Sequence, residues 1–265
     1  MKKLFKTKKL TITILFFGLF LVSFSLYPKY IFVSDFNKMG ECSGAEKVQS
    51  YVTKTCEKDD IPLQGEISEE TKIFKIEAKI PKIGQEKIDR EIKDFVKKVI
   101  SDFKRENPKL PIINGQTNGK KPSWKNELWI SPKIYVYSKS IKSVRFDVYQ
   151  FTGGAHGITN VFTRTFNLKT GKEITWGDLF QHEHNPLEII SPLARSDLKV
   201  MLGKMADDKW IDEGTSEKNP ENYKNWVVEK KGLRIIFSQY QVGPYAIGMP
   251  EVLVPWEKIN SILKP

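Results

Sequence analysis

The longest hydrophobic run of the chain stands near its start. No charged residue occurs from Leu10 to Tyr27, and leucine, isoleucine, phenylalanine and valine dominate this run. As a helix the run would span roughly 27 Å, close to the thickness of a membrane hydrocarbon core. Five lysines precede it, namely Lys2, Lys3, Lys6, Lys8 and Lys9. Because basic residues stay on the cytoplasmic side, residues 1–9 are predicted to form a cytoplasmic tail and the rest to lie outside.

Two interpretations of this segment remain open, an uncleaved membrane anchor and a cleaved secretory signal. A signal peptide ends in small residues at its cleavage site, and the sequence from Ser23 to Pro28 shows no clear site of this kind. We therefore favour an anchor at residues 10–27, which predicts a single-pass protein of the cell membrane whose bulk is extracytoplasmic. Cleavage would instead make the protein secreted.

Beyond residue 60 the hydrophobic positions follow two periods. Alternation from Ile73 to Ile80 predicts a strand that ends at Pro81. From Gln85 to Arg105 the apolar residues recur on one face of a helix, which Asn107-Pro108 would end. Residues 109–125 are rich in proline, glycine, asparagine and lysine, and predict a loop. Alternating segments around 134–136, 144–148 and 161–168 then predict strands, the last followed by a tight turn at 169–171.

The second half of the chain mixes helical and strand patterns. Thr175 and Asp178 have capping-box spacing, which predicts a short helix. Ser191-Pro192 is typical of a helix start, with an apolar stripe after it, and residues 206–223 predict a long surface loop. Strands are expected at 226–229, 233–237 and 252–254, before a terminal helical turn at 256–263. The predicted fold class is α+β, a mixed, mostly antiparallel sheet with two amphipathic helices on one face, preceded by one N-terminal hydrophobic helix.

The domain organisation follows from these patterns. Residues 28–60 are predicted to be a membrane-proximal segment, and residues 61–265 an extracytoplasmic domain with an N-terminal part at 61–125 and a C-terminal part at 126–265. The chain's two cysteines, Cys42 and Cys56, lie in the membrane-proximal segment. In an oxidising compartment we expect a disulfide between them, and unpaired thiols are the alternative.

The net charge of the chain limits the classes of partner that we expect it to bind. The formal net charge is +11, and five of these charges belong to the N-terminal lysine cluster, which leaves +6 for the rest. This modest basic excess favours peptidoglycan or another anionic wall polymer, or a lipid surface. The sequence has no stripe of basic residues interleaved with aromatic ones, so we do not expect nucleic acid as a partner.

Two segments are candidates for ligand binding, and neither carries a nucleophile motif. Residues 151–157 contain Gly153, Gly154 and His156, where glycines permit unusual backbone angles and the histidine can donate or accept. A simple hairpin tip would explain the same residues. Residues 238–250 combine Tyr240, Pro244, Tyr245 and Gly248 in a segment with few charges, which is common in recognition surfaces. These tyrosines could equally cover the edge of a sheet.

A metal centre is the alternative chemistry. His182 and His184 lie near Asp178 and Glu183, but residues two apart on a helix point in different directions. The zinc-binding pattern H-E-x-x-H is missing, so we expect a polar turn, neither metal nor cofactor, and no catalytic residue.

Several stretches of the chain resemble a known family. They are residues 151–157, 165–175, 179–180, 237–248 and 250–252. They resemble an extracytoplasmic domain of unknown function, shared by the non-catalytic region of the peptidoglycan deacetylase PdaC and the outer part of RsiV, a lysozyme-sensing anti-sigma factor. The resemblance covers about residues 60–260 and implies an α+β domain that recognises a partner at the cell wall. Neither a catalytic deacetylase domain nor a cytoplasmic sigma-binding domain is expected in this chain.

Three hypotheses follow. The first is a non-catalytic, membrane-tethered domain that binds a cell-envelope glycan or a secreted protein such as lysozyme. Because lysozymes are commonly basic, like-sign repulsion favours the glycan. The second is a metal-dependent hydrolase or deacetylase of the envelope that uses His156 or the His182 and His184 pair. The third is an immunity-type or structural protein that binds another protein.

Overall fold

The computed structural model describes residues 61–110 and 124–264, all within the compact unit Glu57–Pro265. The predicted anchor Leu10–Tyr27 and the predicted Cys42–Cys56 disulfide lie outside these residues. Within them, no helix combines the length and the hydropathy needed to cross a membrane.

Two sheets form the centre of the described domain. The large sheet has the strand order β1-β2-β3-β4-β5-β6, and all neighbours are antiparallel apart from β2 and β3, which are parallel. Its strands are β1 (Leu63–Glu70), β2 (Phe74–Pro81), β3 (Asn126–Val136), β4 (Ile141–Phe151), β5 (Ile158–Asn167) and β6 (Lys172–Ile174). The small antiparallel sheet contains β7 (Trp226–Glu229), β8 (Gly232–Ile236) and β9 (Glu251–Pro255). The α+β class with a mixed, mostly antiparallel sheet is therefore confirmed.

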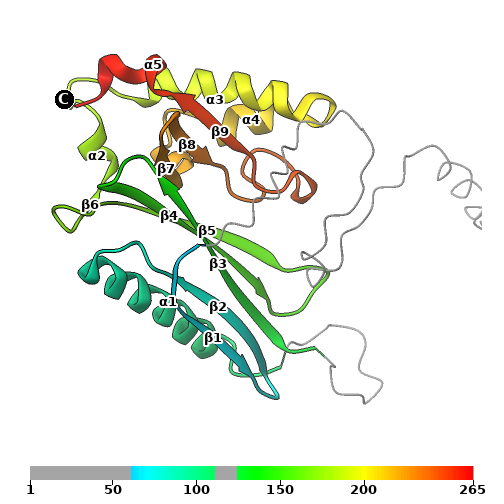
Figure 1. Cartoon of the computed structure of the whole chain (residues 1–265). Coiled ribbons are helices and arrows are strands. Elements are labelled where there is room, and N and C mark those ends of the chain that lie inside the picture. The colour runs from blue at the N-terminus through cyan, green and yellow to red at the C-terminus, as the bar shows by residue number, and fades with distance from the viewer. Residues whose placement is uncertain (1–60, 111–123, 265) are drawn as a thin grey trace, which may run out of the picture. The chain divides into compact units, whose positions relative to one another are not determined.

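The elements form four layers (Figure 1). Helix α1 (Glu86–Glu106) packs on one face of the large sheet, and the small sheet packs on the other. Helix α3 (Leu187–Leu202) covers the far side of the small sheet. The expected single sheet with both helices on one face is therefore corrected to two sheets with one long helix each. The large sheet takes a layer on each face because Tyr135 and Val161 are buried on the face opposite α1.

Helix α1 agrees with its predicted boundaries. The Gln85 side chain accepts a hydrogen bond from the Ile88 backbone amide at 2.8 Å, which caps the start of the helix. One face buries Ile88, Ile92, Val96, Ile100 and Phe103 against the large sheet. The opposite face is charged, so the helix needs no further cover.

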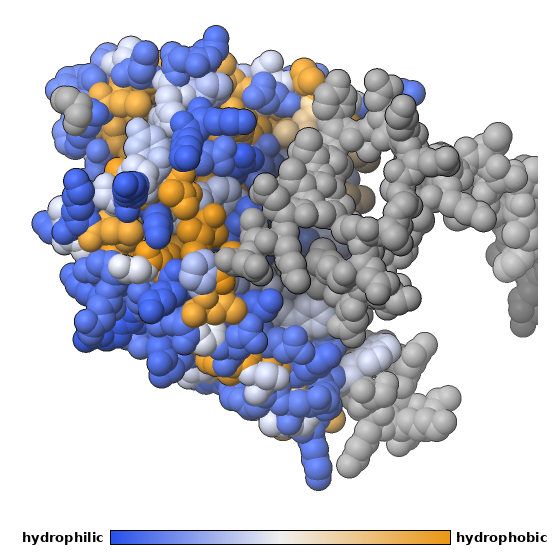
Figure 2. All heavy atoms as spheres, viewed as in Figure 1, coloured by the Kyte–Doolittle hydropathy of each residue, from blue (hydrophilic) through white to orange (hydrophobic). Residues whose placement is uncertain are grey.

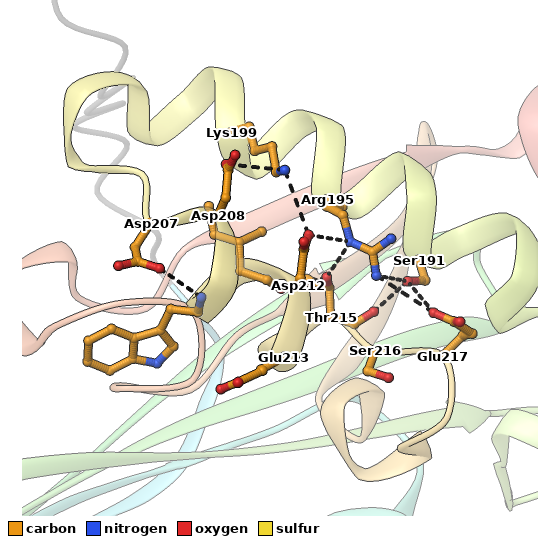
Figure 3. Close-up of polar contacts among 12 residues, drawn as sticks. Ser191, Arg195, Lys199, Asp207, Asp208, Asp212, Glu213, Thr215, Ser216 and Glu217 are labelled. Atoms are coloured by element: carbon orange, nitrogen blue, oxygen red, sulfur yellow. Dashed lines mark hydrogen bonds and ion pairs between the residues drawn. The ribbon is translucent and has the colours of Figure 1, made fainter.

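The predicted start of α3 at Ser191-Pro192 is wrong. The helix begins at Leu187, and both residues lie inside it. Ser191 is fully buried, and its hydroxyl donates to the Thr215 carbonyl instead of capping the helix. Arg195 of the same helix bonds the Ser191 and Thr215 hydroxyl oxygens at 3.2 Å each (Figure 3). Ser191 therefore makes a tertiary contact from the interior of the helix. Local sequence rules do not reveal a contact of this kind.

The segment 206–223, predicted to be a long loop, contains helix α4 (Asp208–Gly214) and a 3-10 turn η3 (Pro220–Tyr223). The Asp207 side chain accepts from the Trp210 amide at 2.9 Å and caps α4. Lys199 of α3 pairs with Asp208 at 3.2 Å, as Figure 3 shows. These contacts stabilise a helix that is too short to be stable alone.

Short elements complete the domain. Helix α2 spans Trp176–Leu179 and has the predicted capping box between Thr175 and Asp178. Gly171 has φ 66°, as expected for the turn before β6. The remaining elements are η2 (Gly203–Met205), η4 (Tyr245–Ile247), α5 (Trp256–Ile259) and η5 (Asn260–Ile262).

An ionic network joins the two sheets. Arg145 of β4 bonds Asp147 on its own strand at 2.7 Å and the Glu251 carboxylate of β9. Glu251 also pairs with Arg234 of β8 at 3.2 Å. Arg234 in turn makes two bonds to Glu229 of β7, at 2.9 and 3.2 Å. Positive and negative groups therefore alternate through the layer between the sheets.

Tyr135 lies beside this network, and we expect it to make the stability of the domain sensitive to alkaline pH. Burial, reinforced by the Glu251 carboxylate, raises the pKa of Tyr135 to about 12, against an opposing effect of Arg145. The unfolded chain releases this proton near pH 10, before the folded chain does, so stability is expected to fall as the pH rises from 10 to 12. By pH 11 the loss should be about 1.4 kcal/mol.

Urea unfolding at pH 9, 10 and 11 measures this loss, and Tyr135→Phe is the matched variant because it keeps the ring and removes the titrating hydroxyl. The variant should show a shallower alkaline decline than the parent chain. Equal declines in the two proteins would contradict the assignment to Tyr135.

Candidate recognition site

Two loops meet at one end of the large sheet. The first joins β4 to β5 and contains Gly153 and Gly154, both with positive φ, at 105° and 98°. The second joins β8 to β9. Its Gln239 side chain accepts from the Thr159 amide at 2.8 Å, which places it against the first residues of β5. Both segments that the sequence nominated for binding therefore lie side by side.

The centre of the site is a stacked pair of rings. His156 and Tyr245 have ring centroids 4.0 Å apart and planes inclined by 25°. Tyr240 lies next to both, with its centroid 5.8 Å from that of Tyr245 and its hydroxyl 3.4 Å from His156 Nε2. His156 Nδ1 lies 2.9 Å from the Gly157 carbonyl oxygen. Because a carbonyl can only accept, the neutral ring carries its proton on Nδ1 and Nε2 is free to accept from Tyr240.

Tyr240 has a strained backbone. Its φ is 65°, a region that residues with a side chain seldom occupy, so the surroundings must hold it there. Its carbonyl accepts from Trp210 Nε1 of α4 at 2.9 Å. The next residue, Gln241, donates to the carbonyls of Gly214 at 2.9 Å and Asn222 at 2.8 Å. Helix α4 and the turn after it therefore hold the loop in place.

The β4–β5 loop is also tightly seated. A Cβ atom on Gly157 would lie 2.4 Å from the Tyr149 ring, so a larger residue here would have to displace that ring. Burial raises the pKa of Tyr149, with the charges of Glu127 and Tyr245 as smaller causes. The Tyr149 ring is 5.5 Å from that of Trp129 on the neighbouring strand. The rings of Tyr149 and Trp129 therefore support the loop from the adjoining strands β4 and β3.

The other nominated residues border the ring pair. Pro244 is exposed and precedes η4, the 3-10 turn that contains Tyr245, and Gly248 ends this turn with φ 69°. Sequence reasoning missed the supporting residues Trp210, Gln239 and Tyr149. For Tyr149 a signal existed, because an aromatic residue stands at a polar-face position of a strand. Trp210 had no such signal, since α4 itself was not predicted.

The segment with His182 and His184, expected to be a polar turn and considered as an alternative metal site, lies elsewhere. His182 Nε2 is 3.1 Å from Lys264 Nζ near the end of the chain. Across residues 61–110 and 124–264, no group of three or more histidine, cysteine, aspartate or glutamate side chains is arranged to hold a metal ion. The two hydrogen bonds of the His156 ring go to Gly157 and Tyr240.

Two known families match separate stretches of this domain. Residues 67–159 match the family described as deacetylase PdaC. Residues 177–257 match the family described as a protein of unknown function, DUF3298. The chain contains a PdaC/DUF3298-like domain. The β4–β5 loop of the site falls in the first match and the β8–β9 loop in the second.

Curated relatives share this region. The peptidoglycan-N-acetylmuramic acid deacetylase PdaC of Bacillus subtilis is 28% identical over 195 residues, 73% of this chain and 40% of the relative. Immunogenic protein MPT64 of Mycobacterium tuberculosis is 29% identical over 47% of this chain and 53% of its own length. Esterase Rv3036c of the same organism has the same identity and coverage. The chain thus spans about half or less of the length of these relatives.

Solved structures show the same fold. A DUF3298 family protein of Bacteroides fragilis superposes with a TM-score of 0.50 at 17% identity, over 76% of this chain and 92% of the other. A DUF3298 family protein of Pseudomonas aeruginosa also gives 0.50, at 12% identity, over 78% and 96%. At these identities the likeness concerns the fold alone.

Proposed function

We propose that the PdaC/DUF3298-like domain is a non-catalytic, extracytoplasmic recognition module, tethered to the membrane through Leu10–Tyr27, and that it binds a cell-envelope glycan at the rings of His156, Tyr240 and Tyr245. The observation that carries this proposal is the strained, cross-braced Tyr240 loop. Backbone strain of this kind persists only where the surrounding structure stabilises it, and it clusters at functional sites.

The chemistry of the three rings suits a sugar. Aromatic faces offer an apolar surface to the C–H groups of a pyranose, while the phenol and imidazole groups donate and accept hydrogen bonds at the edge. Tyr240 is 42% exposed, His156 is exposed and Tyr245 is half-buried, so a ligand can reach this ring cluster from solvent. A loop that is already fixed loses little conformational entropy on binding.

Charge supports a glycan over a basic protein. The net charge beyond the N-terminal lysine cluster is +6, which attracts anionic wall polymers such as peptidoglycan and repels basic secreted proteins such as lysozyme. An immunity-type or structural partner remains a separate hypothesis, and its signature is a single co-purifying protein.

A hydrolase function is the second candidate, and the names of two relatives, a deacetylase and an esterase, favour it. The chain covers 40% of the deacetylase and 53% of the esterase, so those activities need not reside in the shared part. In the site described here, the His156 ring bonds a backbone carbonyl and a tyrosine. It is not paired with a serine or carboxylate, as a general base for hydrolysis would be.

Tyr245→Ala is expected to weaken binding to soluble peptidoglycan fragments about 30-fold, the effect of losing about 2 kcal/mol at a central aromatic contact. Isothermal titration of the parent and variant chains measures the change. Tyr137→Ala is the matched control, since Tyr137 is an exposed tyrosine, at 41%, at the other end of the large sheet.

Parallel titrations with lysozyme separate the two ligand classes. If the chain binds lysozyme but not the fragments, the ligand is a protein and not a glycan. If both tyrosine variants bind fragments equally, or the parent binds neither ligand, the proposed site is wrong. Turnover of the fragments that is lost in His156→Ala would favour the hydrolase.

A further inference from the structure

Three turns meet at the end of the large sheet opposite the recognition site. They are the β3–β4 turn at 137–140, the β7–β8 turn at Lys230 and Lys231, and the start of α5. The rings of Tyr137 and Trp256 meet edge to face, with centroids 5.6 Å apart. Trp256 Nε1 donates to the Glu229 carbonyl at 3.0 Å and its amide to that of Lys231 at 3.4 Å. Aromatic rings therefore hold these turns together.

The surface of this region is both apolar and basic. Val136 is 44% exposed and Tyr137 is 41% exposed. Figure 2 shows hydrophobic side chains at the surface among hydrophilic ones on the face that it draws. We use the name lysine–aromatic end for the set formed by Val136, Tyr137, Lys139, Lys230, Lys231, Trp256 and Lys258.

The lysines of this set are available to a partner. Lys139, Lys230, Lys231 and Lys258 are all exposed, and in the described part of the chain none of them forms an ion pair. Two acids lie in the same turns. Glu229 is committed to Arg234, which leaves the exposed Glu257. The net charge of the lysine–aromatic end is therefore positive.

Strand topology places the entry of the chain at the same end. Leu63, at the start of β1, pairs with Pro81 at the end of β2. Strand β2 runs parallel to β3, so its end points the same way as Val136, the last residue of β3. The described domain therefore begins at the end of the sheet that carries the lysine–aromatic set. The recognition site lies at the far end of β4, which at 3.4 Å per residue is about 34 Å away.

We propose that the lysine–aromatic end rests on an anionic lipid surface and that the recognition site consequently faces away from the membrane. Tyrosine and tryptophan prefer the boundary between headgroups and acyl chains, and exposed lysines attract anionic headgroups. A soluble polyanion would satisfy the lysines but would leave Val136 in water, so the exposed valine favours lipid. In the sequence, the predicted membrane segment Leu10–Tyr27 precedes this first strand.

Partitioning onto lipid vesicles tests the proposal with the compact unit Glu57–Pro265, which contains both sheets and their hydrophobic cores and lacks the predicted anchor. We expect binding to vesicles with 30% phosphatidylglycerol and little binding to pure phosphatidylcholine. Each lysine near an anionic surface contributes about fivefold, so Lys139→Gln, Lys230→Gln and Lys231→Gln together should weaken partitioning on the order of 100-fold.

The matched control removes three exposed lysines elsewhere, through Lys72→Gln, Lys93→Gln and Lys97→Gln. It changes net charge equally and should weaken partitioning far less. Val136→Ser should weaken it severalfold. Equal losses in the two triple variants, or no binding by the parent unit, would overturn the proposal. If Val136→Ser partitions like the parent unit, and soluble polyphosphate releases both proteins equally well, the ligand of this end is a soluble polyanion and not lipid.

Discussion

Replacing Arg145 by alanine is expected to lower the free energy of unfolding by about 3 kcal/mol. The Arg145 side chain is 6% exposed, and its guanidinium neutralises the carboxylates of Asp147 and Glu251 between the two sheets. Burial already raises the pKa of Asp147, and the opposing effect of Arg145 limits that rise. Without the arginine, two partly buried carboxylates would face each other with less positive charge nearby. We expect a loss at the lower end of the range for a broken buried ion pair, because both carboxylates retain some contact with water.

Urea unfolding followed by tryptophan fluorescence measures this change. Arg105→Ala is the matched control, because Arg105 pairs with an acid on the exposed face of α1 and should contribute little. Combining Arg145→Met with Glu251→Leu should recover part of the loss, since a buried ion pair can be replaced by apolar groups of similar size. An Arg145→Ala variant as stable as the control would contradict the role given to the network.

The second large effect is expected at Gly214, the last residue of α4. A Cβ atom there would lie 2.1 Å from the Gln241 carbonyl oxygen and 2.8 Å from Val242. The first of these atoms belongs to the backbone, so a side-chain rotation cannot relieve the clash. Gly214→Ala should therefore destabilise the domain by about 3 kcal/mol, at the upper end of the cost of overpacking. It should also displace the loop that carries Tyr240 and Tyr245.

Two measurements distinguish these consequences. Urea unfolding gives the loss of stability, and the ring-current shift of the His156 protons in NMR spectra reports whether the stack on Tyr245 survives. Gly177→Ala is the control, because a Cβ at this position meets only Thr175 Oγ1, at 3.9 Å. A stable Gly214→Ala protein with an unchanged His156 spectrum would show that α4 does not position the loop.

Local signals account for the elements that were predicted correctly. Helix α1 has an apolar stripe, a capping residue at its start and Asn107 at its end, so all of its determinants lie within the helix and its flanking residues. The turn at Gly171 and the capping box at Thr175 are equally local. Ser191 shows the limit of such signals. A Ser-Pro pair favours a helix start, but the Thr215 carbonyl, far away in sequence, satisfies this hydroxyl in the interior of α3.

The sequence by itself determined the α+β class, the positions of most strands, and the two segments that carry His156, Tyr240 and Tyr245. These properties follow from periodicity, turn residues and short motifs, which act over a few positions. Only the tertiary structure decided that there are two sheets with a helix on each outer face, and that His156 stacks on Tyr245. Both depend on pairings between residues distant in the chain. Such pairings arise from burial and long-range hydrogen bonds, which leave no fixed spacing in the sequence.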